Sequence, residues 1–353
     1  MWAVTNNTRF KVAPAFARDA QGAEIWIVAV RATFSIASDG PEARVTVADE
    51  QHDVCLSPQH FGEPGRASLR YDIDVVRTKP GTDIILHAHA HAPGGKPARA
   101  VDVGVAVGPM VKRLRVVGDR TWRKGWRNVT PSNAEPFVSL PIRYERAWGG
   151  PLTGSDARNE FNPIGVGADA TPGAPVPNVE HRDRPIESSR HTGTAAGFGP
   201  IQCDWQPRLK LAGTYDEKWQ RERQPLVPAD FQDAYFRCAP ADQQVNGFLH
   251  GGEEVVLHNL TSNGFLRFHL PRVSLGFRTR FGRSAIHHRG QVHTVIIEPE
   301  ERRLIMVWQT ALPCHHTLYD LRDTLVVEKQ RVPLGDNAAR RDGAQEESEL
   351  VAG

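Results

Sequence analysis

The sequence predicts an all-β protein with mainly antiparallel, sandwich-like sheets, and two observations support this. Short apolar runs that fit β-strands recur toward both ends of the chain, and compact turns rich in glycine and proline separate them. Three such turns are Lys79-Pro-Gly-Thr-Asp83, Ala92-Pro-Gly-Gly-Lys96 and Gly118-Asp-Arg120. Glycine permits a positive φ and proline fixes its own φ, so we expect each turn to form a rigid corner between strands.

The first expected strand pair is a hairpin. Across residues 24–36 apolar side chains occupy alternate positions, and the opposite face becomes polar from Arg31 onward. This pattern predicts a strand that is buried on both faces at first and on one face later. Residues 19–22 form a polar turn before it, so we expect residues 8–17 to pair with it.

Further strands follow from the same kind of pattern, with short turns between them. They are expected at residues 84–90, 101–107, 111–117, 254–260, 265–270, 292–298, 302–308 and 325–328. The Asn263-Gly264 step between two of these runs is a strong hairpin signal. The strands define an N-terminal β region, residues 1–121, and a C-terminal β region, residues 240–334. The two regions are compatible with one composite domain or with two domains.

The middle segment, residues 122–239, is expected to be ordered but irregular. It has no clean period, many prolines and most of the tryptophans. Such aromatic residues can anchor long loops or form a recognition surface, and anchoring offsets the entropy that is lost when loops are ordered. The capping-box pattern at residues 214–217 predicts a short helix over 215–223. The polar tail, residues 335–353, is expected to be disordered.

Composition and charge restrict the possible partners. Lysine plus arginine number 43 against 41 acidic residues, which gives a formal charge of +2. No net field therefore favours nucleic acid or an anionic membrane, and we expect neither partner. No apolar run is long enough for a membrane span, and no signal peptide opens the chain, so a cytoplasmic location is expected. The four cysteines lie far apart, which argues against a zinc ribbon and for reduced thiols.

Three histidines form the best enzyme-like pattern. His87, His89 and His91 alternate along an expected strand, so their side chains would share one face and could bind a metal. Additional ligands would have to come from elsewhere; candidates by residue type are Asp83, His287, His288, His293, His315 and His316. An exposed strand face near a turn explains the same three histidines without a metal.

Two other patterns suggest catalysis only weakly. Cys314 precedes His315 and His316, but adjacent residues on a strand point in opposite directions, so a packed cysteine is favoured over a nucleophile. Asp72 and Asp74 could act as an acid–base pair, although a solvated face beside Arg70 and Arg77 is a simpler interpretation. The usual phosphate-loop, dinucleotide, nucleophile-elbow and zinc-protease motifs do not occur, and no cofactor is expected.

A series of short runs resembles a known family. The series includes Trp26-Ile-Val-Ala-Val30, Ser68-Leu-Arg-Tyr71, Lys79-Pro-Gly-Thr-Asp83, Tyr144-Glu-Arg146, Ala196-Gly-Phe-Gly-Pro200, Ala212-Gly-Thr-Tyr-Asp216 and Leu312-Pro-Cys314. Taken in order over nearly the whole chain, these runs resemble the bacterial domain-of-unknown-function family 2169 (DUF2169), which is associated with type VI secretion.

The resemblance implies a non-enzymatic adaptor or chaperone. Such a protein would bind a secreted toxic effector and help to load it onto the secretion spike (VgrG) and its PAAR-type tip. No catalytic residues follow from the resemblance. The chain departs from the family pattern at His87, His89 and His91, where small residues and glycine are common. The alternative function is a metal-dependent hydrolase, or another enzyme on a β scaffold, that uses this histidine face.

An adaptor could bind its partner at an exposed sheet edge or in a groove lined by the aromatic middle segment. Tryptophan, tyrosine and arginine dominate binding hot spots, and each can equally serve a structural role. On this basis the candidates for protein binding are Arg70, Tyr71, Arg120, Trp122, Tyr144, Arg146, Trp148, Tyr215 and Trp219.

Overall fold

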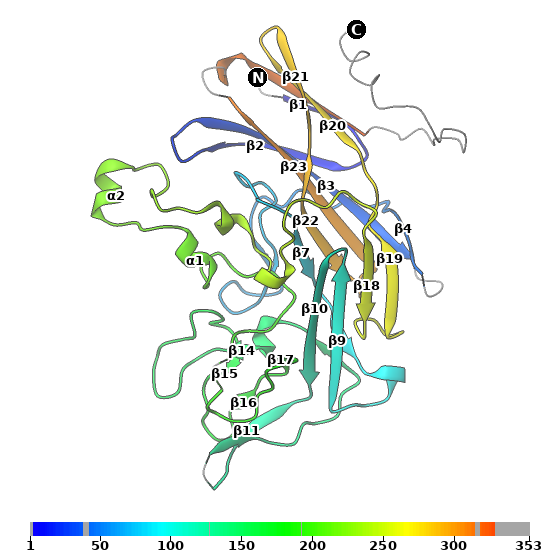
Figure 1. Ribbon diagram of the computed structural model, residues 1–353, viewed down its shortest axis with the longest axis vertical. Coiled ribbons are helices and arrows are strands. Elements are labelled where there is room, and N and C mark those ends of the chain that lie inside the picture. Colours follow the sequence, from blue (N-terminus) through cyan, green and yellow to red (C-terminus); the bar gives the residue numbers. More distant parts are fainter. Residues whose placement is uncertain (1–2, 38–41, 127, 192, 315–317, 329–353) are drawn as a thin grey trace.

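The computed structural model describes residues 3–37, 42–126, 128–191, 193–314 and 318–328. Within these ranges strands dominate and the helices are short, which confirms the all-β class. The larger sheets occupy the upper and middle parts of Figure 1, and short strands joined by loops form the lower end. No helix in the described ranges is both long and apolar enough to cross a membrane.

A six-stranded sheet forms the centre of the molecule. Its strands run in the order β2-β3-β23-β22-β7, and β4 lies on the same edge of β3 as β2. The strands are β2 (Lys11–Arg18), β3 (Glu24–Ala37), β4 (Arg44–Val47), β7 (Asp83–Leu86), β22 (Gln291–Glu298) and β23 (Arg303–Pro313). Neighbours are antiparallel except for β7, which runs parallel to β22. Strands from both ends of the sequence therefore meet in one sheet.

A four-stranded sheet, order β1-β24-β20-β21, lies at the top of Figure 1. Its strands are β1 (Ala3–Asn7), β24 (Leu321–Glu328), β20 (Leu275–Phe281) and β21 (Ser284–Arg289). The β1–β24 pair is parallel and the other pairs are antiparallel. Trp26 of the central sheet donates its indole N–H to Thr324 Oγ1 at 2.8 Å, which joins the two sheets through a buried hydrogen bond.

A five-stranded antiparallel sheet, order β17-β10-β9-β18-β19, forms the third large layer. Its strands are β9 (Ala100–Val107), β10 (Met110–Val117), β17 (Val179–His181), β18 (Glu254–His258) and β19 (Phe265–His269). The β9–β10 and β18–β19 hairpins come from distant parts of the chain and join where β9 pairs with β18. The N-terminal and C-terminal β regions thus share one sheet.

The remaining elements are short. The short strands are β5 (Gln59–His60), β6 (Leu69–Tyr71), β8 (His89–His91), β11 (Arg120–Lys124), β12 (Val129–Pro131), β13 (Ser139–Pro141), β14 (Trp148–Gly149), β15 (Val166–Gly167) and β16 (Pro175–Val176). The helices are α1 (Arg208–Leu211) and α2 (Glu217–Glu222), with 3-10 turns η1 (Pro93–Gly95), η2 (Tyr144–Arg146), η3 (Asp233–Phe236), η4 (Ala241–Gln243) and η5 (Leu318–Asp320). Helices α1 and α2 lie on an arm that projects to the left in Figure 1.

Strands β3, β23, β22 and β7 of the central sheet are largely buried on both faces. One face contributes Val30 and Leu304 to the main core, which also contains Val105 of the five-stranded sheet and Phe277 of the four-stranded sheet. The opposite face forms a second cluster, whose members are Cys55, Tyr71, Ile85, Cys238, Ala239, Ile296, Ile305 and Val307. Burial on both faces explains why these strands are rich in apolar residues on both faces, in contrast to the alternation of a half-exposed strand.

Most of the expected local structure is confirmed. The β2–β3 and β18–β19 hairpins form, and β3 is buried continuously before Ser35 becomes exposed. Arg31 and Thr33 are nevertheless buried, so the expectation of a polar outer face from Arg31 onward is wrong there. The second buried cluster covers that face, and Asp74 supplies a buried partner for Arg31 at 2.7 Å.

Two expected elements differ from the structure. The strand expected at residues 84–90 is divided into β7 and β8, because the chain leaves the central sheet after Leu86 and pairs with β13. The helix expected at residues 215–223 is shorter, and Asp216 rather than Thr214 caps it by accepting from the Trp219 amide at 2.8 Å. The tail expected at residues 335–353 lies outside the described residues.

Candidate functional site

Arg70 and Tyr71, two of the expected binding residues, lie over a buried carboxylate. Glu298 at the end of β22 is fully buried, and the Tyr71 hydroxyl donates to its two oxygens at 2.7 and 2.9 Å. Arg70 and Arg303 also form ion pairs with Glu298, at 3.0 and 2.6 Å. Burial, followed by the nearby Glu298 charge, raises the pKa of Tyr71 to about 12, so its hydroxyl remains a donor. The network fastens β6 to the central sheet.

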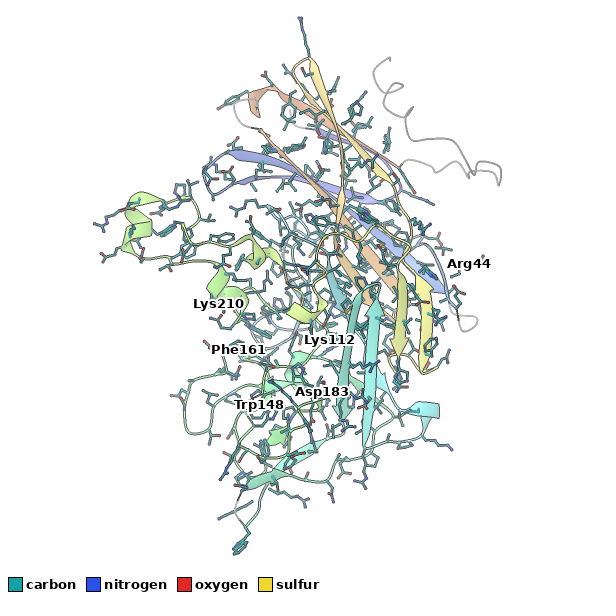
Figure 2. All side chains as sticks on the ribbon, in the orientation of Figure 1. Arg44, Lys112, Trp148, Phe161, Asp183 and Lys210 are labelled. Carbon is teal, nitrogen blue, oxygen red and sulfur yellow. The ribbon has the colours of Figure 1, made fainter. Side chains whose placement is uncertain are left out.

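Five further candidates make contacts within the protein, and four of them lie toward its lower end. Trp122 and Trp148 are buried in a small core with Val176 and Ile186. Figure 2 shows Trp148 in this lower region. Their position supports the anchoring role expected for aromatics of the middle segment.

The polar members of this group are also engaged within the protein. Arg120 pairs with the buried Glu180 and donates to the carbonyl of Pro177. Tyr144 is buried and donates to the carbonyl of Gly199 at 3.0 Å. Arg146 is more accessible, and it contacts Asn178 at 3.0 Å and Asp119 at 3.3 Å. The contacts of Arg120 and Arg146 join the segments next to β10, β17 and η2, whereas that of Tyr144 joins η2 to the segment that follows β17.

The three histidines do not form one exposed face. His87 is buried against Phe61 and donates from Nε2 to the carbonyl of Arg70 at 2.7 Å. Burial lowers the pKa of His87 to about 4, so it is neutral at physiological pH. His91 instead donates to Glu300 at 2.7 Å, while His89 Nδ1 lies 3.8 Å from the same carboxylate.

The other residues considered as metal ligands lie elsewhere. Asp83 is buried between Lys79 and Arg237, and His293 stacks on Phe248. His287 and His288 belong to β21 in a different sheet. Throughout the described residues, no group of three or more His, Cys, Asp or Glu side chains is arranged to hold a metal ion. His315 and His316 lie outside the described residues. Of the expected Cys314-His315-His316 pattern the structure therefore describes only Cys314, which is buried.

Asp72 and Asp74 do not form a solvated face, and that interpretation is wrong. Asp74 is buried with Arg31, and it also accepts from the Cys55 amide at 2.7 Å. Asp72 pairs with Arg208 of α1 at 2.8 Å. The difference arises because β6 ends at Tyr71 and the fold brings Arg208 of α1 to Asp72 and Arg31 of β3 to Asp74. Both carboxylates therefore hold layers together.

Of the two remaining candidates, Trp219 lines a groove on the projecting arm, and Tyr215 packs against Trp219 beside the groove. The groove has a volume of about 450 Å³. It is lined by Thr214, Asp216, Lys218, Trp219, Glu222, Arg223, Ala229 and Asp230. The Tyr215 ring is 54 % exposed and meets the Trp219 ring edge-on, with centroids 4.7 Å apart. Lys210 marks α1 on this arm in Figure 2.

The walls of the groove are fixed by hydrogen bonds within the arm. Asp230 accepts from the Thr214 amide at 3.0 Å and from its hydroxyl at 2.8 Å, and these bonds lower the pKa of the carboxyl. Trp219 donates its indole N–H to the carbonyl of Leu226 at 2.7 Å. Arg223 donates to the carbonyls of Val227 and Ala20, so it fastens the arm to the turn between β2 and β3.

Sequence reasoning missed the polar rim of this groove. Lys218 and Glu222 are exposed and lie four residues apart on α2, where side chains of a helix become neighbours. Their spacing could have been read from the sequence once the helix was expected. Asp230 could not have been, because only the fold brings it to Thr214.

Comparison with known proteins gives one match. A family model described as an uncharacterized protein conserved in bacteria (DUF2169) matches residues 21–309. The matched range begins in the turn between β2 and β3 and ends in β23, so it includes the arm and its groove. No curated protein and no solved structure matches the chain.

Proposed function

The chain belongs to the DUF2169 family, and on this basis we propose that it is a non-enzymatic adaptor for type VI secretion. It binds a secreted toxic effector in the bacterial cytoplasm and helps to load it onto the spike (VgrG) and its PAAR-type tip. The role derives from the resemblance of the chain to proteins associated with this secretion system.

The groove on the arm is the observation that best supports protein binding. The half-buried Trp219 lines the groove, and the exposed Tyr215 packs edge-on against it, on an arm that projects from the sheets. Aromatic side chains provide a large contact area at a low cost in conformational entropy, and they are enriched in binding hot spots. The charged rim formed by Lys218 and Glu222 could orient a bound segment. A segment of the effector is therefore the proposed occupant.

The polar groups of the groove favour binding over catalysis. Asp216 caps α2, Asp230 holds Thr214, and Arg223 is bonded to two backbone carbonyls. A general acid or base must be able to reach the proton that it transfers. These side chains instead maintain the shape of the arm, which leaves the rings and the rim as recognition elements.

Co-purification tests the proposed function. The full chain is co-expressed with the products of genes adjacent to its own, and complexes are measured by size-exclusion chromatography with light scattering. We expect a defined complex with an effector or a spike component. If no such component is retained at micromolar concentrations, the adaptor function is wrong.

Variants of the arm test the position of the contact. We expect Tyr215→Ala to weaken the effector complex about tenfold, the loss typical of one hot-spot side chain. Trp126→Ala is a matched control, because Trp126 is a 94 % exposed aromatic residue between β11 and β12 at the far end of the molecule. Equal affinity of wild type and Tyr215→Ala would exclude the groove as the contact while leaving the complex itself established.

A further inference from the structure

The hairpin formed by β20 and β21 presents an unpaired sheet edge. A two-residue turn, Gly282-Arg283, joins the strands, and Gly282 adopts a φ of +56° as this kind of turn requires. β20 pairs with β24 on its other side, whereas β21 is the last strand of its sheet. Among the described residues, no strand pairs with the outer edge of β21. The hairpin stands at the top of the molecule in Figure 1.

The geometry of the hairpin shows which backbone groups face outward. A two-residue turn makes its flanking residues, Phe281 and Ser284, a hydrogen-bonded pair, and such pairs alternate along an antiparallel ladder. Ala285, His287 and Arg289 occupy the intervening positions, so their N–H and C=O groups point away from β20. Unpaired groups of this kind are a template for an additional strand.

The side chains around this edge are strongly basic. Residues 275–290 contain four arginines, two histidines and no acidic residue. Arg280 is paired with Asp323 of β24. Arg278, Arg283 and Arg289 have no ion pair within the described part of the chain. This local excess contrasts with the near balance of charge over the whole chain.

The arginines of the two strands lie on one face of the hairpin. Arg278 and His287 are opposite each other across the ladder, and Arg289 lies two residues beyond His287 on the same face. The other face carries Ile286, which is 45 % exposed. A strand added beside β21 would therefore place alternate side chains near basic groups and near an apolar side chain.

We propose that the outer edge of β21 binds an extended acidic segment of a partner protein, which adds to the sheet as a fifth strand. Backbone hydrogen bonds supply the affinity, and acidic side chains opposite His287 and Arg289 supply the selectivity. Pairing with a second copy of β21 would bring like charges together, which is destabilising. The proposal rests on the adaptor function only in assuming that the partner is a protein.

A defined peptide tests this proposal. The probe is a synthetic peptide of about seven residues, the usual length of a strand, that alternates glutamate with valine and carries a fluorophore. Fluorescence anisotropy with the full chain is expected to show saturable binding that weakens with salt. A peptide with lysine in place of glutamate is expected not to bind. Equal binding of the two peptides would overturn the selectivity that we infer.

Two variants test the strand edge and its basic face. His287→Pro removes an outward N–H, together with the imidazole, without removing a bond of the β20–β21 ladder, and proline is tolerated at such edge positions. Arg289→Glu reverses one charge of the basic face. We expect each to weaken peptide binding at least tenfold while the melting temperature and circular dichroism spectrum stay close to wild type. Undiminished binding by a folded His287→Pro chain would overturn strand addition.

A matched control excludes a general effect of net charge. Arg113→Glu changes the net charge by the same amount at an exposed position on β10, in another sheet. It is expected to bind the peptide as wild type does, and an equal loss would overturn the local site. Dimerisation that His287→Pro abolishes, without peptide binding by wild type, would identify a second copy as the occupant and overturn the proposal.

The two proposals fail separately. If the acidic peptide does not bind but an effector or spike complex forms, only the proposal for the β21 site is wrong. If the peptide binds in a way that depends on His287 and Arg289 but no effector or spike complex forms, the β21 site is supported and the adaptor function is wrong.

Discussion

Tyr71 donates its hydroxyl to both carboxylate oxygens of Glu298, at 2.7 and 2.9 Å, across 227 positions of sequence. Glu298 is the last residue of β22, and its fully buried carboxylate also receives Arg303 and Arg70. One acidic side chain thereby joins β6, β22 and β23. The loop that covers the second cluster depends on this junction.

Replacement of Glu298 should destabilise the whole fold. In Glu298→Gln the side-chain shape is retained but Arg303 loses its buried counter-charge, and we expect a loss of about 3 kcal/mol in the free energy of unfolding. Urea denaturation measures the change. Glu301→Gln is the control, since Glu301 meets Arg70 at a more exposed position, and it should cost less than about 1 kcal/mol. Equal effects of the two variants would contradict the role of burial.

The buried His293 should make stability depend on pH. Burial, reinforced by the Lys79 charge, lowers the pKa of His293 to about 3. In the unfolded chain the imidazole takes up a proton below about pH 6.5, whereas in the folded chain it stays neutral. The wild type should therefore lose about 1.4 kcal/mol per pH unit between pH 6.5 and 3 through this residue.

His293→Phe isolates that contribution, because it removes the titrating group and keeps a ring against Phe248. Urea denaturation of both chains at several pH values gives the difference in slope. Other titrating groups cancel in the comparison. Parallel stability curves for the two chains would show that His293 is protonated equally in both states.

Gly81 should be intolerant of a side chain. Its backbone φ is not in the left-handed region, but a Cβ there would overlap the carbonyl oxygen of Val245 and lie 2.6 Å from that of Gly247. Gly81→Ala should cost about 1–3 kcal/mol through overpacking. Gly104→Ala in β9, where the nearest atom would be 3.6 Å away, should not destabilise. Thermal unfolding of both variants checks the prediction, and a stable Gly81→Ala chain would contradict it.

Metal analysis separates the adaptor from the enzyme alternative. His87 and His91 direct their Nε2 atoms to different acceptors, the carbonyl of Arg70 and the carboxylate of Glu300. We therefore expect wild type and His89→Ala to retain the same amount of zinc after equilibration with the metal and dialysis. One equivalent bound by wild type and lost in His89→Ala would favour an enzyme that uses the histidine face.

Local turn chemistry made much of the fold predictable. The Asn263-Gly264 step and the polar turn before β3 led directly to two hairpins that the structure contains. The parallel pairs β1–β24 and β7–β22 and the junction of β9 with β18 were not predictable in this way. Such pairings join distant segments, and no residue type near either strand specifies the partner.

The candidate site was harder to predict because composition does not distinguish two uses of the same side chain. Trp122 and Tyr215 were chosen for the same reason, yet one is buried in a core and the other is exposed at the groove. The basic edge of β21 was overlooked because charge was considered over the whole chain. Its sequence signal, four arginines without an acid in residues 275–290, is nevertheless plain.

The pairing of β1 with β24, and of β3 with β23, has a consequence for biosynthesis. While the ribosome is still producing the middle of the chain, β3 has been made but β23, which pairs with it, has not. The long apolar strand β3 therefore lacks one of its two neighbours at that stage. The layers can assemble only once the final strands emerge. These pairs are thus expected to form only after β23 and β24 have been synthesised, and folding is expected to benefit from factors that protect nascent apolar strands from aggregation.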